Sequence, residues 1–253
     1  PSGRGQKLQP GPIKLLALER GIPVFQPARI RKEENRELFE KLQPDFIVVA
    51  AYGQILPGWL LKTARIAPIN VHASLLPKYR GPAPIQWAII NGERETGVTT
   101  MLMDRGLDTG EMLLSSRVDI KPDDTAGTLH DRLSEIGASL LIDTIQKIKD
   151  GSLRPIPQNH ALSSYAPMLT KQDGHIDWGK PAEHIERFIR GMTPWPGAFT
   201  FVNDKRMRIF KSKISDPGLS GIPGKVVQGF SNEFLVATGK GVLSILEVQL
   251  DSG

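Results

Sequence analysis

The sequence predicts an α/β protein built in two parts, a domain with a mostly parallel sheet followed by a small all-β domain. Short apolar strands alternate with helices up to about residue 150, which is typical of a parallel sheet. Beyond residue 197 the pattern changes to short β runs separated by Gly, Pro, Asn and Asp. With 253 residues, of which 40% are hydrophobic, the chain is long enough for two modest cores.

The first half of the α/β part contains two predicted helices and two predicted strands. Residues 13–20 carry four apolar side chains in a short helical segment that Gly21 closes. Residues 22–25 follow as a short edge strand, because their proline cannot donate to a central ladder. Residues 33–42 form a charged helix, and the apolar run 46–51 is typical of a parallel strand covered on both faces.

The second half of this part ends in a long amphipathic helix, for which Thr125 is the expected N-cap and Gly151 the stop. Three strands and one helix precede it. The predicted strands are residues 68–72, 98–103 and 112–120, and the predicted helix is residues 81–91.

The domain boundaries follow from the change of pattern. We expect an α/β domain over residues 1–152 and a β domain over residues 171–253, joined by residues 153–170, which show no periodicity and are typical of a linker. The β domain opens with a helix and a rigid turn at residues 193–197, and its five β runs predict a barrel or sandwich. Because the chain stops soon after the fifth run, a closing element is expected to be missing. The runs are residues 198–202, 207–214, 224–227, 234–238 and 242–248.

Composition excludes several classes of function. Without cysteine there is no disulfide, no thiolate zinc site and no cysteine nucleophile. No apolar run approaches about 18 residues, so no membrane span is expected. No G-x-G-x-x-G opens a helix and no P-loop is present, which disfavours a dinucleotide cofactor and phosphoryl transfer. No metal is expected either, because His72 has no second ligand at helical spacing. A net charge of +5 and a pI of about 9.4 weakly favour an anionic partner such as nucleic acid.

Three polar side chains form the candidate active site. Asn70 and His72 stand at the end of a strand and point the same way, because strand side chains alternate between faces. Asp108 lies in a Gly-rich loop one crossover later. An amide can donate to an oxyanion, an imidazole can move a proton and a carboxylate can orient the imidazole, which is what acyl transfer requires. Taken singly, Asn70 and His72 could be a satisfied polar pair, and Asp108 could be a turn former.

Two motifs resemble the folate-dependent formyltransferases, namely residues 70–77 (NVHASLLP) and residues 106–110 (GLDTG). The resemblance covers nearly the whole chain, and four further stretches are most similar to family members that act on charged tRNA. These stretches are residues 1–5, residues 52–57, residues 80–86, and residues 176–178 with 194–197. The family implies a Rossmann-like sheet followed by an OB-fold-like barrel. It also implies a strand and a helix before the loop at residues 1–12, so we expect the N-terminal strand to be missing from this chain.

For the reaction, the resemblance implies a formyl donor, 10-formyltetrahydrofolate as co-substrate, and an acceptor, the α-amino group of methionine on charged initiator tRNA. The amine would attack the formyl carbon directly. Asn70 and His72 would stabilise the tetrahedral oxyanion, and His72 would pass a proton towards folate N10. Asp108 would orient His72, directly or through a water.

The resemblance also assigns binding residues. The folate would lie along residues 74–77, and its pterin would enter a pocket made by the 52–57 segment and the Asp108 loop. The implied folate-binding residues are Ser74, Leu75, Leu76, Pro77, Ile55, Leu56, Gly106 and Leu107. The tRNA would contact the basic first loop and the β barrel through their cations. The implied tRNA-binding residues are Arg4, Lys7, Lys205, Arg206 and Arg208.

Three other interpretations stay open. A related enzyme could formylate another amine, such as a sugar nucleotide, or could pass the formyl group to water. A protein of a different class could bind tRNA without catalysis. The first loop with the β domain favours the tRNA enzyme, and the presence of Asn70, His72 and Asp108 favours catalysis. We expect a monomer in a bacterial cytoplasm or an organelle matrix.

Overall fold

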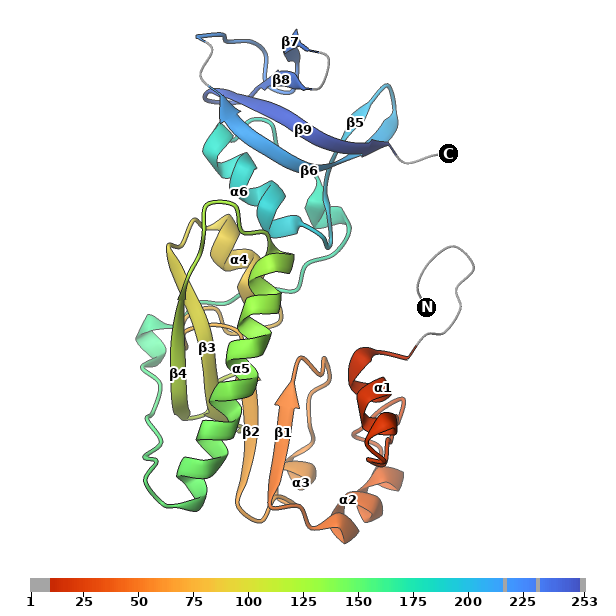
Figure 1. Ribbon diagram of the computed structural model, residues 1–253, viewed down its shortest axis with the longest axis vertical. Helices are drawn as coiled ribbons and strands as arrows, with labels where there is room; N and C mark the ends of the chain where they lie inside the picture. The colour runs from red at the N-terminus through yellow and green to blue at the C-terminus, as the bar shows by residue number, and fades with distance from the viewer. Residues whose placement is uncertain (1–9, 216–217, 231–232, 251–253) are drawn as a thin grey trace.

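The computed structural model describes residues 10–215, 218–230 and 233–250. Figure 1 shows two units stacked along the long axis of the molecule, with the sheet β1–β4 and helix α5 below and a second sheet with helix α6 above. The predicted fold class, a Rossmann-like α/β domain followed by an all-β domain, is confirmed. The second sheet is antiparallel throughout, with the strand order β5-β6-β9-β8-β7.

The elements match the predicted order closely. In the α/β unit they are α1 (Pro12–Glu19), α2 (Arg36–Leu42), β1 (Phe46–Ala50), α3 (Gly58–Leu61), β2 (Ala67–His72), α4 (Pro84–Ile90), β3 (Glu95–Leu102), β4 (Met112–Asp119) and α5 (Ala126–Lys149). In the β unit they are α6 (Ala182–Met192), β5 (Ala198–Val202), β6 (Lys205–Ser215), β7 (Val226–Gly229), β8 (Phe234–Ala237) and β9 (Val242–Leu250). Three short 3-10 helices complete the described chain at Glu33–Asn35, His160–Leu162 and Gln172–Gly174. The short α3 was not predicted.

The first sheet is mixed, and the expectation of a mostly parallel sheet is wrong. Its order is β1-β2-β3-β4, and only β1 and β2 run parallel. The physical reason lies in the connections. A parallel crossover needs about a dozen residues or more, so the loop 103–111 is too short for one and β3 and β4 must be antiparallel. The connection from β2 to β3, residues 73–94, is long enough for either direction, and its length does not explain why that pair is antiparallel.

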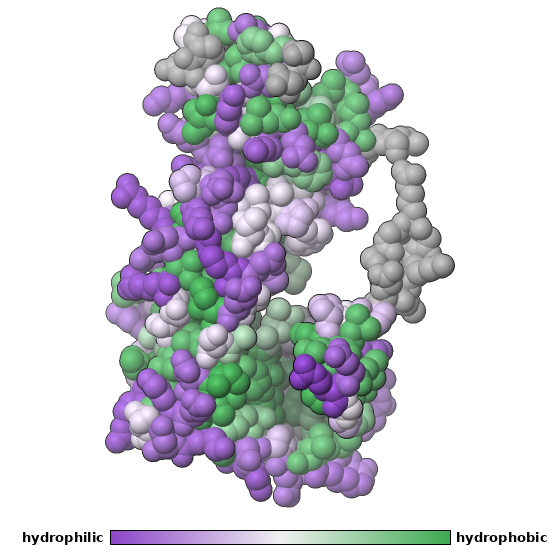
Figure 2. All heavy atoms as spheres, viewed as in Figure 1, coloured by the Kyte–Doolittle hydropathy of each residue, from purple (hydrophilic) through white to green (hydrophobic). Residues whose placement is uncertain are grey.

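The predicted strand at residues 22–25 is also wrong, because these residues pair with no strand among those described. In the described part of the chain β1 is the outermost strand, and residues 22–25 do not pair with its open edge. The expectation that β1 is covered on both faces is also wrong, because Val48 on this strand is 42% exposed. Helix α1 buries none of its side chains, and Figure 2 shows apolar residues gathered over this lower half of the molecule.

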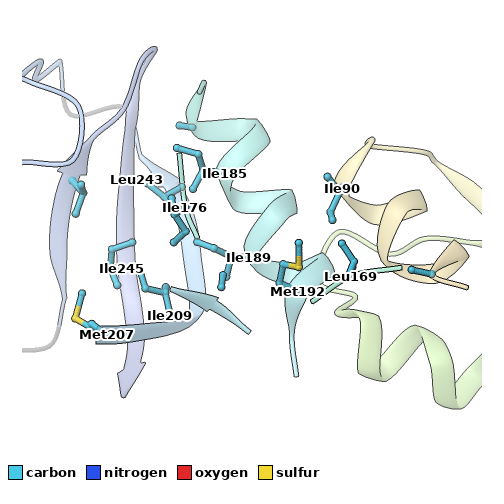
Figure 3. Close-up of a cluster of buried hydrophobic side chains, with 14 residues drawn as sticks. Ile90, Leu169, Ile176, Ile185, Ile189, Met192, Met207, Ile209, Leu243 and Ile245 are labelled. Carbon is cyan, nitrogen blue, oxygen red and sulfur yellow. The ribbon is translucent and has the colours of Figure 1, made fainter. Parts of the chain in front are cut away.

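One apolar cluster joins the two units. Helix α6 lies between the β sheet and α4, and its Ile185 and Ile189 point towards the sheet while its Met192 lies towards Ile90 of α4 (Figure 3). The two helices approach closely at Gly191, where an added Cβ would lie 2.6 Å from Ile90 Cγ1. The contact between units is therefore a packed core and not a hinge.

Helix α5 covers one face of the first sheet and begins as predicted. Thr125 is its N-cap and forms a capping box with Thr128. The adjacent Asp124 is buried and accepts hydrogen bonds from Arg132 Nη2 at 2.6 Å and from the N–H of Lys121 at 2.7 Å. Within the described residues, no helix is long and apolar enough to cross a membrane.

Replacing Asp124 by alanine is expected to lower the free energy of unfolding at pH 7 by about 1–3 kcal/mol, because buried donors lose their acceptor. Burial would raise the pKa of Asp124, but the hydrogen bonds and charge of Arg132 outweigh it and lower that pKa. The carboxylate therefore stabilises the fold above its unfolded pKa of about 3.9, and the contribution is lost as pH falls through the lower folded pKa. Urea unfolding of both proteins at pH 7 and near pH 3 tests this. A difference that does not shrink in acid contradicts it.

Candidate active site

Strand β2 places Asn70 and His72 on the sheet face opposite α5. Gly137 of α5 comes close to Val71, since a Cβ there would lie 3.2 Å from Val71 Cγ1. Because side chains alternate along a strand, the residues on either side of Val71 point to the other face. The predicted shared direction of Asn70 and His72 is thus confirmed, and only 6% of His72 is exposed.

The loop between β3 and β4 brings Asp108 to the same place. Its Oδ1 accepts from Asn70 Nδ2 at 3.3 Å, and its Oδ2 accepts from the N–H of Gly81 at 2.8 Å. The same Oδ2 lies 3.6 Å from His72 Nδ1. That distance is in the ion-pair range but too long for a direct hydrogen bond. The structure therefore brings the three predicted side chains together around one carboxylate.

The other imidazole nitrogen fixes how His72 can carry a proton. His72 Nε2 lies 2.9 Å from the carbonyl oxygen of Tyr79. A carbonyl oxygen can only accept, so Nε2 must carry hydrogen. The proton that His72 can exchange is therefore the one on Nδ1, the nitrogen that faces Asp108.

Two residues next to the imidazole hold left-handed backbone conformations. Tyr79 has φ 59° and Asp108 has φ 52°. For residues other than glycine such conformations cost about 1–3 kcal/mol and persist only where surrounding contacts enforce them. Tyr79 supplies the carbonyl oxygen next to His72 Nε2, and Asp108 supplies the carboxylate next to His72 Nδ1. Both strained residues therefore contact the imidazole ring.

The Tyr79 side chain anchors this turn. Its hydroxyl donates to Glu93 Oε1 at 2.8 Å and accepts from Asn91 Nδ2 at 3.2 Å. Burial, assisted by the bond to Glu93, raises the pKa of Tyr79 to about 12. The hydroxyl therefore stays neutral at ordinary pH and acts as an anchor.

The predicted folate residues lie around the site with different exposures. Ser74 and Leu76 are buried, and the Ser74 hydroxyl donates to the carbonyl of Lys78 at 2.6 Å. Leu75 and Pro77 are half-buried. Ile55 and Leu107 are exposed, so apolar surface is open to a ligand there. Leu56 is half-buried, and Gly106 is exposed at the base of the Asp108 loop.

The predicted tRNA contacts divide into two groups. Arg4 and Lys7 lie outside the described residues. Lys205, Arg206 and Arg208 all lie on β6, where Lys205 is exposed and the other two are half-buried. The Arg206 guanidinium lies 3.7 Å from the centre of the Phe199 ring on the neighbouring strand.

One residue of the site was missed from the sequence. Gln158 is buried, and its side chain reaches the carbonyl of Asp108 from the segment between the units. It lies where the sequence has no periodicity, so no signal distinguished it from an exposed glutamine. In the described part of the chain, no three His, Cys, Asp or Glu side chains gather as a metal site would require.

Comparison with known proteins places the chain in a family. The family described as formyl transferase matches residues 1–145, and the formyl transferase C-terminal domain matches residues 168–253. The chain belongs to the formyl transferase family, as its motifs predicted. It is 52% identical to the methionyl-tRNA formyltransferase of Alkaliphilus oremlandii (strain OhILAs), over 98% of this chain and 80% of that protein.

Two further comparisons agree with this. The methionyl-tRNA formyltransferase of Desulfotalea psychrophila (strain LSv54 / DSM 12343) is 50% identical over 98% of this chain and 77% of that protein. A solved structure of the methionyl-tRNA formyltransferase from Clostridium thermocellum shares the fold with a TM-score of 0.65. The two chains are 19% identical in sequence, and the match covers 95% of this chain and 92% of the solved chain.

Proposed function

We propose that the chain transfers a formyl group from 10-formyltetrahydrofolate to the α-amino group of methionyl initiator tRNA. The observation that carries the proposal is the grouping of Asn70 and His72 within 3.6 Å of the Asp108 carboxylate, on the face of β2 away from α5. The identity of about 50% to methionyl-tRNA formyltransferases supports this choice of substrates.

The geometry supports the following proposed roles. The amine attacks the formyl carbon, and the carbonyl oxygen becomes an oxyanion. One hydrogen of Asn70 Nδ2 bonds Asp108, which leaves the second to stabilise that oxyanion. His72 accepts the proton of the attacking amine at Nδ1 and delivers it to folate N10 as the N10–carbon bond breaks. Asp108 favours the imidazolium formed in between.

The rest of the chain would deliver the two substrates. In this proposal residues 1–152 hold the folate and the reacting groups, and residues 171–253 contact the tRNA. Residues 153–170 join the two. We also propose a monomer, in which Asn70, His72 and Asp108 meet within one chain. The tRNA substrate indicates a bacterial cytoplasm or an organelle matrix.

The direct test is to incubate the full chain with 10-formyltetrahydrofolate and charged initiator tRNA, and to measure formylmethionine released from the tRNA. A parallel reaction with an amino-sugar nucleotide tests the nearest alternative acceptor. A reaction without acceptor tests hydrolysis of the folate. Formylation of the sugar or release of formate, with no formylmethionine, overturns the proposal. Tight tRNA binding without any turnover indicates a binding protein instead.

Replacing Lys205 by alanine is expected to weaken tRNA binding and to reduce the slope of log affinity against log salt by about 1, the value for one lost phosphate contact. Lys205 is exposed at the start of β6, beside the half-buried Arg206. Lys240, exposed in the turn before β9, provides the control Lys240→Ala. Equal salt slopes for wild type and Lys205→Ala contradict a phosphate contact at this position.

A further inference from the structure

We propose that Gln158 is a positioning residue for Asp108, so that the segment joining the two units is part of the catalytic framework. The inference rests on the proposed function in taking Asp108 as a member of the reacting site. The structural part of the proposal is that the Gln158 side chain holds the Asp108 loop, a contact that we call the clamp. This part can be tested without an activity assay.

The Gln158 side chain uses its full hydrogen-bonding capacity in this place. Nε2 donates to the carbonyl oxygens of Asp108 at 2.9 Å and Gly110 at 2.7 Å. Oε1 accepts from Arg80 Nε at 3.0 Å and Nη2 at 2.7 Å. A primary amide offers two hydrogens and two lone pairs, so none is left over. The guanidinium also fixes the orientation of the amide, because a flipped amide would set its NH₂ against the donors of Arg80.

The clamp holds the backbone of Asp108, while other groups hold its carboxylate. At the carboxylate, Asn70 and the N–H of Gly81 supply the hydrogen bonds. At the backbone, Gln158 binds the carbonyl of the same residue. A left-handed backbone at an aspartate persists only when contacts enforce it from several sides. Gln158 supplies the contact that the active-site residues themselves cannot make.

The same segment also holds the turn on the other side of the imidazole. Ser164 Oγ accepts from the N–H of Tyr79 at 2.9 Å, and the Ser164 carbonyl accepts from the N–H of Arg80 at 2.9 Å. The N–H of Ala166 donates to the Arg80 carbonyl at 2.7 Å. The connecting segment therefore binds the backbone of both residues that flank His72, Tyr79 and Asp108.

Losing the clamp should affect the reaction more than binding. Displacing a reacting group by about 1 Å can cost about 10²-fold in rate. Gln158→Leu keeps a similar size but removes all four hydrogen bonds, and we expect kcat to fall about 10- to 100-fold. Gln158→Glu keeps the acceptor for Arg80 but sets a carboxylate oxygen against two carbonyls, and we expect an equal or larger fall. The KM for charged tRNA should stay within about threefold of wild type, because no proposed tRNA contact lies in this loop. The KM for the folate should rise by less than kcat falls, because the loop also carries Gly106 and Leu107, which are proposed folate contacts.

The experiment compares the full-length wild type with these two variants and with Ile156→Ala. Ile156 lies in the same segment with its side chain 56% exposed, so it provides the matched control. We would measure kcat and both KM values, and amide hydrogen exchange over residues 104–112 by mass spectrometry. The proposal expects lower kcat and faster exchange confined to that loop in both Gln158 variants, with Ile156→Ala like wild type.

The possible results distinguish a failure of the positioning role of Gln158 from a failure of the proposed function. A Gln158→Leu variant with kcat within twofold of wild type overturns the positioning role, whether or not its loop exchanges faster. Faster exchange throughout the protein with unchanged kcat per folded molecule indicates a merely structural residue, and also overturns it. A wild type that forms no formylmethionine overturns the proposed function instead. In that case the hydrogen-exchange comparison still tests whether Gln158 holds the Asp108 loop. Unchanged protection of residues 104–112 in the Gln158 variants would show that it does not.

Discussion

Replacing His72 by alanine is expected to lower kcat for formyl transfer by about 10²- to 10⁴-fold, the range that a general acid–base group contributes. Of the two side chains beside His72, Asn70 cannot exchange a proton, and Asp108 is proposed to stay the counter-charge of the imidazolium while it accepts from Asn70 and the N–H of Gly81. Folate affinity should change little, since the implied folate contacts come from other residues. Single-turnover rates with 10-formyltetrahydrofolate and charged tRNA, together with folate binding by fluorescence titration, measure both quantities.

His130→Ala is the matched control for this substitution. His130 has 64% of its side chain exposed on α5, where its ring lies beside the neighbouring Asp131. Removing His72 also leaves the Tyr79 carbonyl without its partner, so the variant should lose about 1–3 kcal/mol of unfolding free energy. Rates are therefore compared per folded molecule. A His72→Ala enzyme within tenfold of wild type by that measure would falsify the assignment of His72 as proton carrier.

Replacing Asp108 by asparagine is expected to lower kcat by about 10²-fold. Asparagine tolerates the left-handed backbone that Asp108 holds, so the loop can keep its shape. The amide has only one acceptor oxygen, however, and two donors face it, the N–H of Gly81 and the NH₂ of Asn70. One donor loses a hydrogen bond to a charged group, worth about 1.5–3 kcal/mol. The imidazolium that forms at His72 loses its counter-charge as well.

The control for this variant is Glu111→Gln, which removes one negative charge from an exposed residue three positions further along the chain. If the long-range field mattered more than the contact, both variants would slow the reaction alike. We expect Glu111→Gln to turn over like wild type in the same steady-state assay. Equal kcat values for Asp108→Asn and wild type would show that Asp108 takes no part in the reaction.

Much of the site follows from local rules. The alternation of side chains along a strand is enough to predict that Asn70 and His72 share one face, and β2 confirms it. The N-cap at Thr125 and all five β runs of the second unit are confirmed, because capping and turn residues act over a few positions. The meeting of Asp108 with Asn70 could be expected only from the combination of the two motifs.

The parts that could not be predicted depend on groups without a sequence signal. The partner of His72 is a backbone carbonyl at Tyr79, and every residue has one. Gln158 is a buried polar side chain in a segment without periodicity, and only its distant partners give it meaning. The direction of β3 depends on how the chain after β2 returns, which an apolar run does not encode.

Because α4 and α6 share a packed cluster that continues into the β sheet, β6 cannot swing freely with respect to His72. A substrate that touches β6 and also reaches His72 must span a length that the protein sets in advance. If a nucleic acid contacts β6 as proposed, only one whose reach matches this length can bring its end to the imidazole. Part of the discrimination between acceptors would thus depend on how rigidly α4 packs against α6, where Ile90 meets Gly191.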